Sequence, residues 1–317
     1  CSLPTRNFQK GFYEKAEEIS GETLADTKLV KNMGCVSCPI RCERRVRVYD
    51  KDVKGPEYET VGLFGANIES ADLDAINEIN YIADLMGMDT ISLGGTIAFA
   101  MELKERGIAD FGVSFGDVAG LPEMIKKIAR REGIYSELAN GSKWLAEKYG
   151  AKDAAIHAKG LELASYKPRK SVGMGLGYAT SNRGGCHLNG GYLALLESVG
   201  VLSADPLETK GKPELTVLMQ NAMEAVSASG FCLFTAYSMI PSFLFRLGPS
   251  HWFTKLCGKL LIWVRPVLGV MWKFMPWILP FNSMFLLPHA EALKHITGLK
   301  MTTGRFMQLG ELSLIHI

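Results

Sequence analysis

The sequence has almost no excess of charge of either sign, because 35 Lys and Arg residues face 33 Asp and Glu residues in a chain of 317. A nucleic-acid-binding protein carries a clear basic excess, so the formal charge of +2 gives no sign of such a partner. Cysteines are few and odd in number, seven in all, which argues against a secreted disulfide scaffold. Apolar residues make up 47%, enough for a sizeable core, and the length favours two domains or one large one.

Neither end of the chain has the features of a natural terminus. Cys1 stands where Met is expected, and no basic-then-apolar signal segment follows it. Residues 312–317 read Leu-Ser-Leu-Ile-His-Ile, which is what a common sequencing adapter gives when it is translated. We therefore expect 312–317 to be a non-native tail and the chain to be a piece of a longer protein.

Helical periodicity dominates the chain, and strand signals are scarce. Apolar residues recur at three- and four-residue spacing, with Gly after the last turn of most segments. The expected helices cover 72–87, 91–106, 122–133, 142–150 (with Ser142 as the cap) and 215–230. Alternation over 45–49 predicts one short β-hairpin. The sequence thus predicts a mostly α fold in two helical domains, 1–159 and 160–311, because Gly and Pro become frequent after residue 160.

Residues 256–288 form the most apolar stretch. A membrane span needs about 20 predominantly apolar residues, whereas three basic residues and three prolines interrupt this stretch. We expect a buried or pocket-capping segment and little membrane contact.

Three cysteines lie within eight residues, at Cys35, Cys38 and Cys42. This spacing places three thiolates around a small volume, which suits an iron–sulfur cluster that still needs a fourth ligand. The candidates for the fourth ligand are Cys1, Cys186, Cys232 and Cys257. A zinc site is the competing interpretation, but no second Cys or His pair accompanies the triplet. Three unrelated core cysteines are the third possibility.

Four arginines, Arg41, Arg44, Arg45 and Arg47, flank the triplet. Positive charge near the sulfurs favours thiolates and raises the potential of a cluster. The same charge would suit docking of an acidic electron carrier, or would form no more than a solvated basic face.

Two segments have matching helix ends, 84–89 and 227–232, each with Gly, then an apolar residue, then Asp89 or Cys232. Gly at a helix end permits the left-handed turn, and that alone explains its presence. The alternative is that the residue after the turn is directed at a shared ligand, since a carboxylate accepts hydrogen bonds from a pterin-like edge.

Taken together, these residues resemble the aldehyde ferredoxin oxidoreductase family. The segments that carry the resemblance are residues 3–8, 35–42, 55–60, 87–92 with 97–102, and 179–188. It extends over nearly all of residues 1–311 and covers the family's second and third domains, both helical. The family's β-rich first domain, which carries much of the pterin site, would lie upstream.

The resemblance implies tungsten, or sometimes molybdenum, in a bis-pyranopterin beside a [4Fe-4S] cluster. It assigns the cluster to Cys35, Cys38, Cys42 and Cys232, and leaves Cys186 as a bystander. The pterin contacts that it implies are Asp84, Gly87, Asp89, Asn182, Arg183, Gly230 and Leu233. Ser227 stands where the family has Asp, which predicts a weaker contact. Glu78 matches a residue that helps to bind an intersubunit metal in some members, but the companion His is missing, so we predict no such metal.

Glu59 and His187 fall where the family has acid/base candidates. Oxidation of an aldehyde adds oxygen from water, so a carboxylate can activate the water and a His can polarise the carbonyl or move a proton. Without the resemblance, Glu59 would be a surface strand residue and His187 a core histidine. Glu57 would share a face with Glu59 in an extended chain and exchange roles with it.

The function implied is oxidation of an aldehyde to a carboxylic acid, with electrons passed to ferredoxin in an anaerobic cytoplasm. Alternatives are reduction of a carboxylic acid or an aromatic thioester, and a non-catalytic iron–sulfur electron-transfer module. A homodimer is compatible with the sequence. Because the upstream domain is missing, we expect this chain alone to be inactive.

Overall fold

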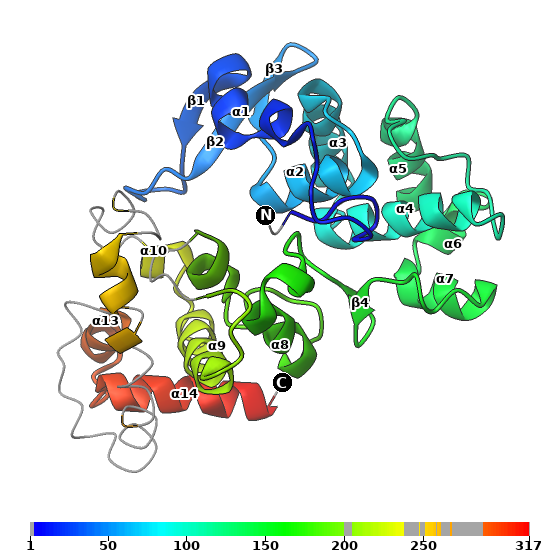
Figure 1. Ribbon diagram of the computed structural model, residues 1–317. Helices are drawn as coiled ribbons and strands as arrows, with labels where there is room; N and C mark the ends of the chain where they lie inside the picture. The colour runs from blue at the N-terminus through cyan, green and yellow to red at the C-terminus, as the bar shows by residue number, and fades with distance from the viewer. Residues whose placement is uncertain are drawn as a thin grey trace. The chain divides into compact units, whose positions relative to one another are not determined.

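The computed structural model describes residues 3–199, 205–237, 251–257 and 288–316, together with positions 247, 259, 260 and 267. The described chain forms two compact units, which divide between Lys167 and Pro168. Helices dominate both units, as expected (Figure 1). The expected pocket-capping stretch 256–288 lies largely outside the described residues. No helix in the described ranges is long and apolar enough to cross a bilayer.

The first unit combines helices with two small antiparallel sheets. Its elements are η1 (Ala16–Ile19), α1 (Gly21–Thr27), β1 (Leu29–Met33), β2 (Glu43–Val48), β3 (Lys51–Lys54), α2 (Tyr58–Phe64), η2 (Ala66–Ile68), α3 (Leu73–Met86), α4 (Thr90–Glu105), α5 (Leu121–Arg130), α6 (Tyr135–Leu138), α7 (Gly141–Tyr149), β4 (His157–Ala158) and β5 (Leu161–Glu162). The expected hairpin is the β2–β3 pair, and β1 extends it to three strands in the order β1-β2-β3. The pair β4–β5 was not expected, because strands of two residues have no readable alternation.

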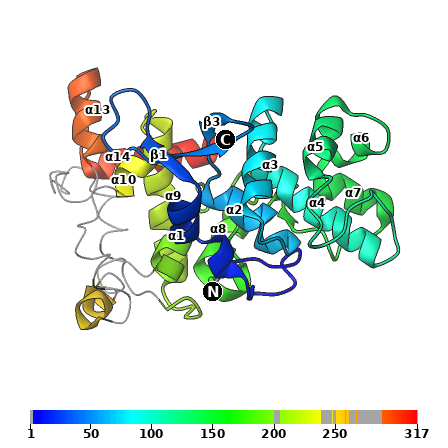
Figure 2. The same ribbon diagram turned by 90° about the horizontal axis from the view of Figure 1, so that it is seen from above.

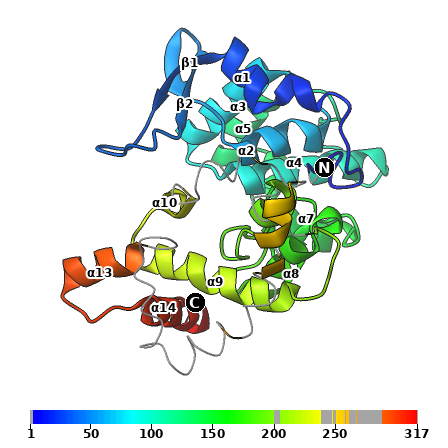
Figure 3. The ribbon, with the colours of Figure 1, turned by 60° about the vertical axis from the view of Figure 1, so that its left-hand side comes forward.

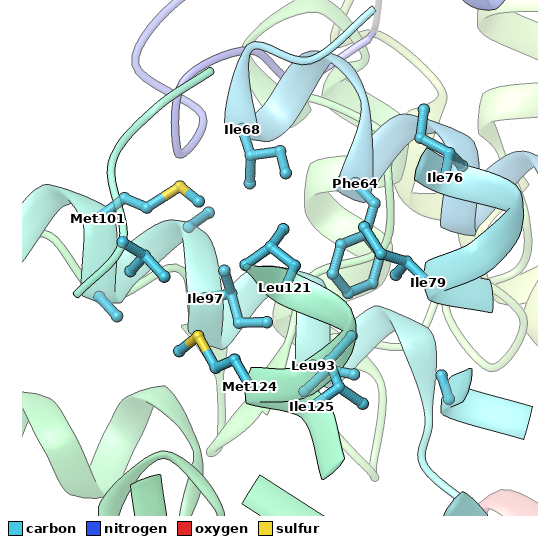
Figure 4. Packing of buried hydrophobic residues seen from close by; sticks show 14 of the residues in the cluster. Phe64, Ile68, Ile76, Ile79, Leu93, Ile97, Met101, Leu121, Met124 and Ile125 are labelled. Atoms are coloured by element: carbon cyan, nitrogen blue, oxygen red, sulfur yellow. The ribbon is translucent and has the colours of Figure 1, made fainter. Parts of the chain in front are cut away.

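Helix α4 is the centre of the first unit. Every residue from Leu93 to Leu103 is buried, because α2, α5, α6 and α7 all pack around this helix or its neighbours (Figure 2). Figure 4 shows the core that results. Its side chains come from α2, η2, α3, α4 and α5, among them Phe64, Ile76, Ile97 and Leu121. This apolar contact is the main stabilising term for helices of this length.

Two expected helix boundaries in this unit have different outcomes. Asp72 caps α3 by accepting hydrogen bonds from the backbone N–H groups of Asp74 (2.9 Å) and Ala75 (3.1 Å), which confirms the predicted start. The prediction that Ser142 caps α7 is wrong, because the N-cap position is Asn140. The N–H and hydroxyl of Ser142 both donate to the carboxylate of Glu162, each at 2.8 Å, so a side chain from β5 satisfies the start of the helix.

The second unit is built around two long helices that pack along each other (Figure 3). Its elements are η3 (Pro168–Lys170), α8 (Val172–Thr180), the π-helical turn η4 (Leu195–Val199), α9 (Lys212–Ala228), α10 (Phe234–Tyr237), α13 (His289–Thr297) and α14 (Thr303–His316). Helix α9 contacts both α8 and α14. The expected tail 312–317 continues α14 as far as His316, and its non-native origin stays a prediction.

A buried ion pair ties α8 to α9. The carboxylate of Glu197 accepts hydrogen bonds from the N–H groups of Gly173 (2.8 Å) and Met174 (3.1 Å) and forms an ion pair with Lys212. Both charged side chains are almost fully buried. A buried ion pair is tolerated only when its remaining hydrogen-bonding groups have partners. Here the backbone N–H groups at the N-terminus of α8 are those partners.

Candidate functional site

The cysteine triplet forms the connection between β1 and β2. The last ladder pair joins Met33 to Glu43, and the three cysteines lie between them. The N–H of Cys38 donates to the carbonyl of Cys35 at 3.0 Å, which makes a tight turn. Gly34 lets the two ends of the connection approach, since a Cβ there would lie 2.9 Å from Cα of Arg41. The shape of this loop is therefore set by local sequence, and the three cysteines follow one another within it.

The surroundings of the three cysteines fit cluster ligands better than core residues. Cys35 and Cys38 are free thiols, and both Cys35 and Cys42 are exposed. Cys38 is half-buried, so none of the three is a buried core cysteine. Arg44 donates to the carbonyl of Cys42 at 3.1 Å, which brings a positive charge to the loop. No three His, Cys, Asp or Glu side chains in the described ranges converge closely enough to hold a metal ion, so the fit rests on donor chemistry: soft thiolates suit iron–sulfur clusters.

Glu59 lies in the first turn of α2, against the segment that follows β5. Its carboxylate accepts a hydrogen bond from the N–H of Ser165 at 2.6 Å and a second from the side chain of Tyr166. Burial, with a smaller contribution from the nearby charge of Asp89, raises the pKa of Glu59 to about 7 against the opposing effect of these hydrogen bonds. Glu59 thus exchanges a proton near neutral pH, as an acid/base catalyst requires.

The close approach of α2 to that segment depends on Gly62. A Cβ at Gly62 would lie 1.7 Å from Oγ of Ser165, so only glycine fits there. The rings of Tyr58 and Tyr166 stack at 5.2 Å, and the hydroxyl of Tyr58 donates to the carbonyl of Ser165 at 3.2 Å. These contacts hold the groups that surround Glu59.

Two sequence interpretations of this region are wrong. Glu59 is not a strand residue, because residues 58–64 are helical. Glu57 does not share an extended segment with Glu59. It is the exposed N-cap position of α2 and lies 3.9 Å from Lys54. The start of the helix after Pro56 sends the two carboxylates into different surroundings, so only Glu59 is placed for proton exchange.

The turn between α3 and α4 carries three expected pterin contacts. Gly87 is left-handed (φ 65°), and the N–H of Met88 donates to the carbonyl of Ala83 at 2.9 Å, which closes α3. Asp89 begins α4, where its carboxylate accepts from the N–H of Ser92 at 2.7 Å. Asp84 and Asp89 are both exposed. Two exposed carboxylates therefore flank this helix junction, and their role in binding stays a prediction.

In the second unit, the segment after α8 carries Asn182, Arg183, Cys186 and His187. Asn182 accepts from the N–H of Arg183 at 2.9 Å, and Arg183 is exposed. Cys186 is buried, and its sulfur contacts the backbone N–H of Asn189 at 3.5 Å. Such a thiol is less accessible to a cluster than an exposed one. The ring of His187 packs edge-on against the ring of Tyr192, with 5.4 Å between the ring centroids.

Cys232 lies in the turn that follows α9. Gly230 is left-handed (φ 75°), and the N–H of Phe231 donates to the carbonyl of Val226 at 3.2 Å. Cys232 is exposed, whereas Leu233 packs against the small core between α9, α13 and α14. The turn thus presents the thiol to solvent while the residue after it anchors the chain.

Sequence reasoning missed two residues behind this turn. The hydroxyl of Thr235 lies 2.5 Å from the carbonyl oxygen of Cys232 and 2.7 Å from Nε2 of His289. His289 is buried, and burial lowers its pKa. The two residues are 54 positions apart, so no spacing in the sequence could have joined them. Ser165 and Tyr166 were missed for the same reason.

These features define a class: a helical protein in two compact units, with an exposed thiol-rich loop and a buried carboxyl group of near-neutral pKa. The model of the family described as aldehyde ferredoxin oxidoreductase, domains 2 & 3, matches residues 1–314. The chain belongs to the aldehyde ferredoxin oxidoreductase family, as the resemblance predicted.

Curated relatives support this membership. The tungsten-containing aldehyde ferredoxin oxidoreductase of Pyrococcus furiosus is 43% identical over 246 residues, which cover 74% of this chain and 40% of that protein. The corresponding protein of Thermococcus kodakarensis is 41% identical over 246 residues, with the same coverage. The chain therefore spans about two fifths of the length of these relatives. A more distant relative, the WOR-like subunit of an aliphatic sulfonate oxidoreductase of P. furiosus, is 28% identical over 205 residues, which cover 59% of this chain and 33% of that protein.

The fold is also found in a solved structure. The active site complex BamBC of benzoyl coenzyme A reductase, in complex with 1,5-dienoyl-CoA, matches with a TM-score of 0.53. The match covers 98% of this chain and 48% of the other, at 17% sequence identity. At this identity the likeness concerns the fold alone and gives no support to thioester reduction.

Proposed function

We propose that this chain is part of a tungsten-dependent oxidoreductase that oxidises an aldehyde to a carboxylic acid. The single observation that carries the proposal is Glu59, a carboxyl group with a pKa of about 7 inside a chain of this family. A carboxyl group with an ordinary pKa is almost fully ionised at neutral pH and is a poor proton donor there. With a pKa of about 7, Glu59 can both accept and donate a proton.

The residues proposed for the cofactors are those that the family resemblance implies. Cys35, Cys38, Cys42 and Cys232 would hold a [4Fe-4S] cluster, and three of these cysteines share one exposed loop. The pterins would contact Asp84, Gly87, Asp89, Asn182, Arg183, Gly230 and Leu233. When bound, the tungsten-bispterin group supplies the two-electron oxidation and the cluster supplies one-electron steps.

The protein contributes proton transfer and positioning. Glu59, as the carboxylate, takes a proton from the attacking water or the substrate, and releases it to solvent after turnover. His187 polarises the carbonyl oxygen of the aldehyde or moves the second proton. One aldehyde and one water give one carboxylic acid, two electrons and two protons. The electrons leave to a ferredoxin-like protein of an anaerobic cytoplasm.

The test is metal analysis of the full-length protein purified without oxygen, followed by an aldehyde screen with a dye acceptor. We expect tungsten (or molybdenum), iron and acid-labile sulfide, together with aldehyde-dependent dye reduction. Iron and sulfide without either heavy metal would refute the proposal and favour the electron-transfer module. Residues 1–317 alone are expected to lack the activity, because they span only part of their relatives.

A further inference from the structure

The segment around the cysteine triplet is far more basic than the rest of the chain. Between Lys28 and Lys54 the sequence has eight basic and three acidic residues, a net charge of +5, whereas the whole chain has +2. The remainder is therefore net negative. Positive charge is concentrated on the three-stranded sheet that carries the thiol loop.

Within this sheet three basic residues form a row across the strands. Lys31 on β1 pairs with Arg45 on β2, and Arg45 pairs with Lys54 on β3. Their neighbours Val46 and Val53 are buried, and side chains alternate along a strand. The three basic residues therefore lie on the opposite face of the sheet from the valines, directed away from the core.

Like charges directly opposite each other destabilise a sheet. The stability of the sheet therefore does not explain this row of basic residues. Partial compensation comes from Glu43, which lies 2.7 Å from Arg45, and from Glu57, at 3.9 Å from Lys54. In the described part of the chain no ion pair involves Lys31. Lysines on edge strands also protect against aggregation, which accounts for β1 and β3. It does not account for Arg45 on the central strand.

The row lies beside the thiol loop. Lys31 and Arg45 are two residues from the last ladder pair, which at about 3.3 Å per residue is roughly 7 Å along the strands. The connection between β1 and β2 extends away from the helices of this unit (Figure 3). Within this connection the apolar side chain of Val36, between Cys35 and Ser37, is 98% exposed. A small exposed apolar group beside a basic face is the composition expected of a transient protein interface.

We propose that the row Lys31–Arg45–Lys54, with Val36, docks an acidic electron-carrier protein of the ferredoxin type. The inference rests on the proposed function, since the carrier is the acceptor of the electrons from aldehyde oxidation. The opposite charges steer the encounter and hold the carrier beside the cysteine loop. Each oxidised carrier accepts one electron, so two carriers are reduced for every aldehyde oxidised, and two protons are released to solvent.

The experiment uses the full-length protein and the double variant Lys31→Glu/Lys54→Glu. The matched control is Lys126→Glu/Arg130→Glu, the same charge change on α5 of the same unit. Binding of an oxidised acidic ferredoxin is measured by calorimetry at low and at physiological ionic strength. We expect the dissociation constant of the sheet variant to rise about tenfold or more at low salt, and that of the control to change little. Iron content and dye-linked aldehyde oxidation should equal the wild type.

An unchanged dissociation constant in the sheet variant would overturn the docking proposal, and so would equal weakening in the control. Tighter binding of duplex DNA than of ferredoxin by the wild type, lost in the sheet variant, would also overturn it. Failure of the proposed function has a different signature. The wild type would then show no aldehyde oxidation with the dye, whatever the binding of ferredoxin.

Discussion

The hydroxyl of Thr235 donates a hydrogen bond of 2.5 Å to the carbonyl oxygen of Cys232. A carbonyl only accepts, so the hydroxyl proton is committed to this bond and the Thr235 oxygen must accept from Nε2 of His289 at 2.7 Å. His289 is thus assigned as the Nε2–H tautomer, and it stays neutral because burial lowers its pKa. The hydrogen bonds that run from His289 through the Thr235 hydroxyl to the accepting carbonyl of Cys232 fix the turn of a proposed cluster ligand.

Thr235→Val keeps the shape of the side chain and removes both hydrogen bonds. Leaving the buried His289 donor without its partner costs about 1–3 kcal/mol. We therefore expect a lower unfolding temperature and reduced iron content in the full-length protein. Thr235→Ser, which keeps the hydroxyl, is the control and should retain both. Equal iron and equal unfolding temperature in the Val variant would show that the turn does not depend on this bond.

Glu59→Gln removes the ionisable group. We expect aldehyde oxidation by the full-length protein to fall by roughly 10²–10⁴-fold, the usual contribution of a general acid or base. The matched control is Glu57→Gln, which changes an exposed carboxylate two positions away. Steady-state kinetics with a dye acceptor measure both. A loss in the Glu57 variant equal to that in the Glu59 variant would contradict the assignment.

The raised pKa of Glu59 also predicts how stability depends on pH. Between 4.5, its ordinary pKa, and about 7, the folded state holds a proton that the unfolded chain has lost. Stability therefore falls as pH rises through this window, since burial then opposes the charge. Above pH 7 we expect Glu59→Gln to be more stable than the wild type by on the order of 3 kcal/mol, and this difference in stability should vanish below pH 4.5. Denaturant titrations at several pH values measure this difference.

Cys232→Ala and Cys186→Ala separate the candidates for the fourth cluster ligand. Cys232 is exposed in a turn, whereas Cys186 is buried against Asn189. We expect Cys232→Ala to lose most of the iron and Cys186→Ala to keep it. Iron and acid-labile sulfide per chain, together with the electron paramagnetic resonance signal of the reduced protein, measure the result. Equal loss in both variants would refute the ligand set.

Gly34→Ala tests the shape of the thiol loop. The added Cβ would lie 2.9 Å from Cα of Arg41, so the two ends of the loop must separate. We expect a marked loss of iron from the full-length protein. Gly21→Ala is the control, because nothing lies within 4 Å of a Cβ there. A Gly34 variant with full iron content would show that the loop opens without loss of the cluster.

Local sequence determined the helices and the cysteine loop. The start of α3 at Asp72 and its end at Gly87 follow from hydrogen bonds within a few residues, so spacing and capping chemistry predicted them. The three cysteines follow from spacing in the same way. The mostly α fold was therefore predictable, and so was the family, because its motifs are continuous in sequence.

Only the tertiary structure decided the chemistry of these residues. The pKa of Glu59 depends on burial against Ser165 and Tyr166, which lie more than 100 residues further along the chain. Ser142 turned out to donate to Glu162 rather than cap its own helix, and His289 to hold the Cys232 turn. Desolvation and hydrogen-bond partners are set by packing between distant segments, and no local pattern contains them.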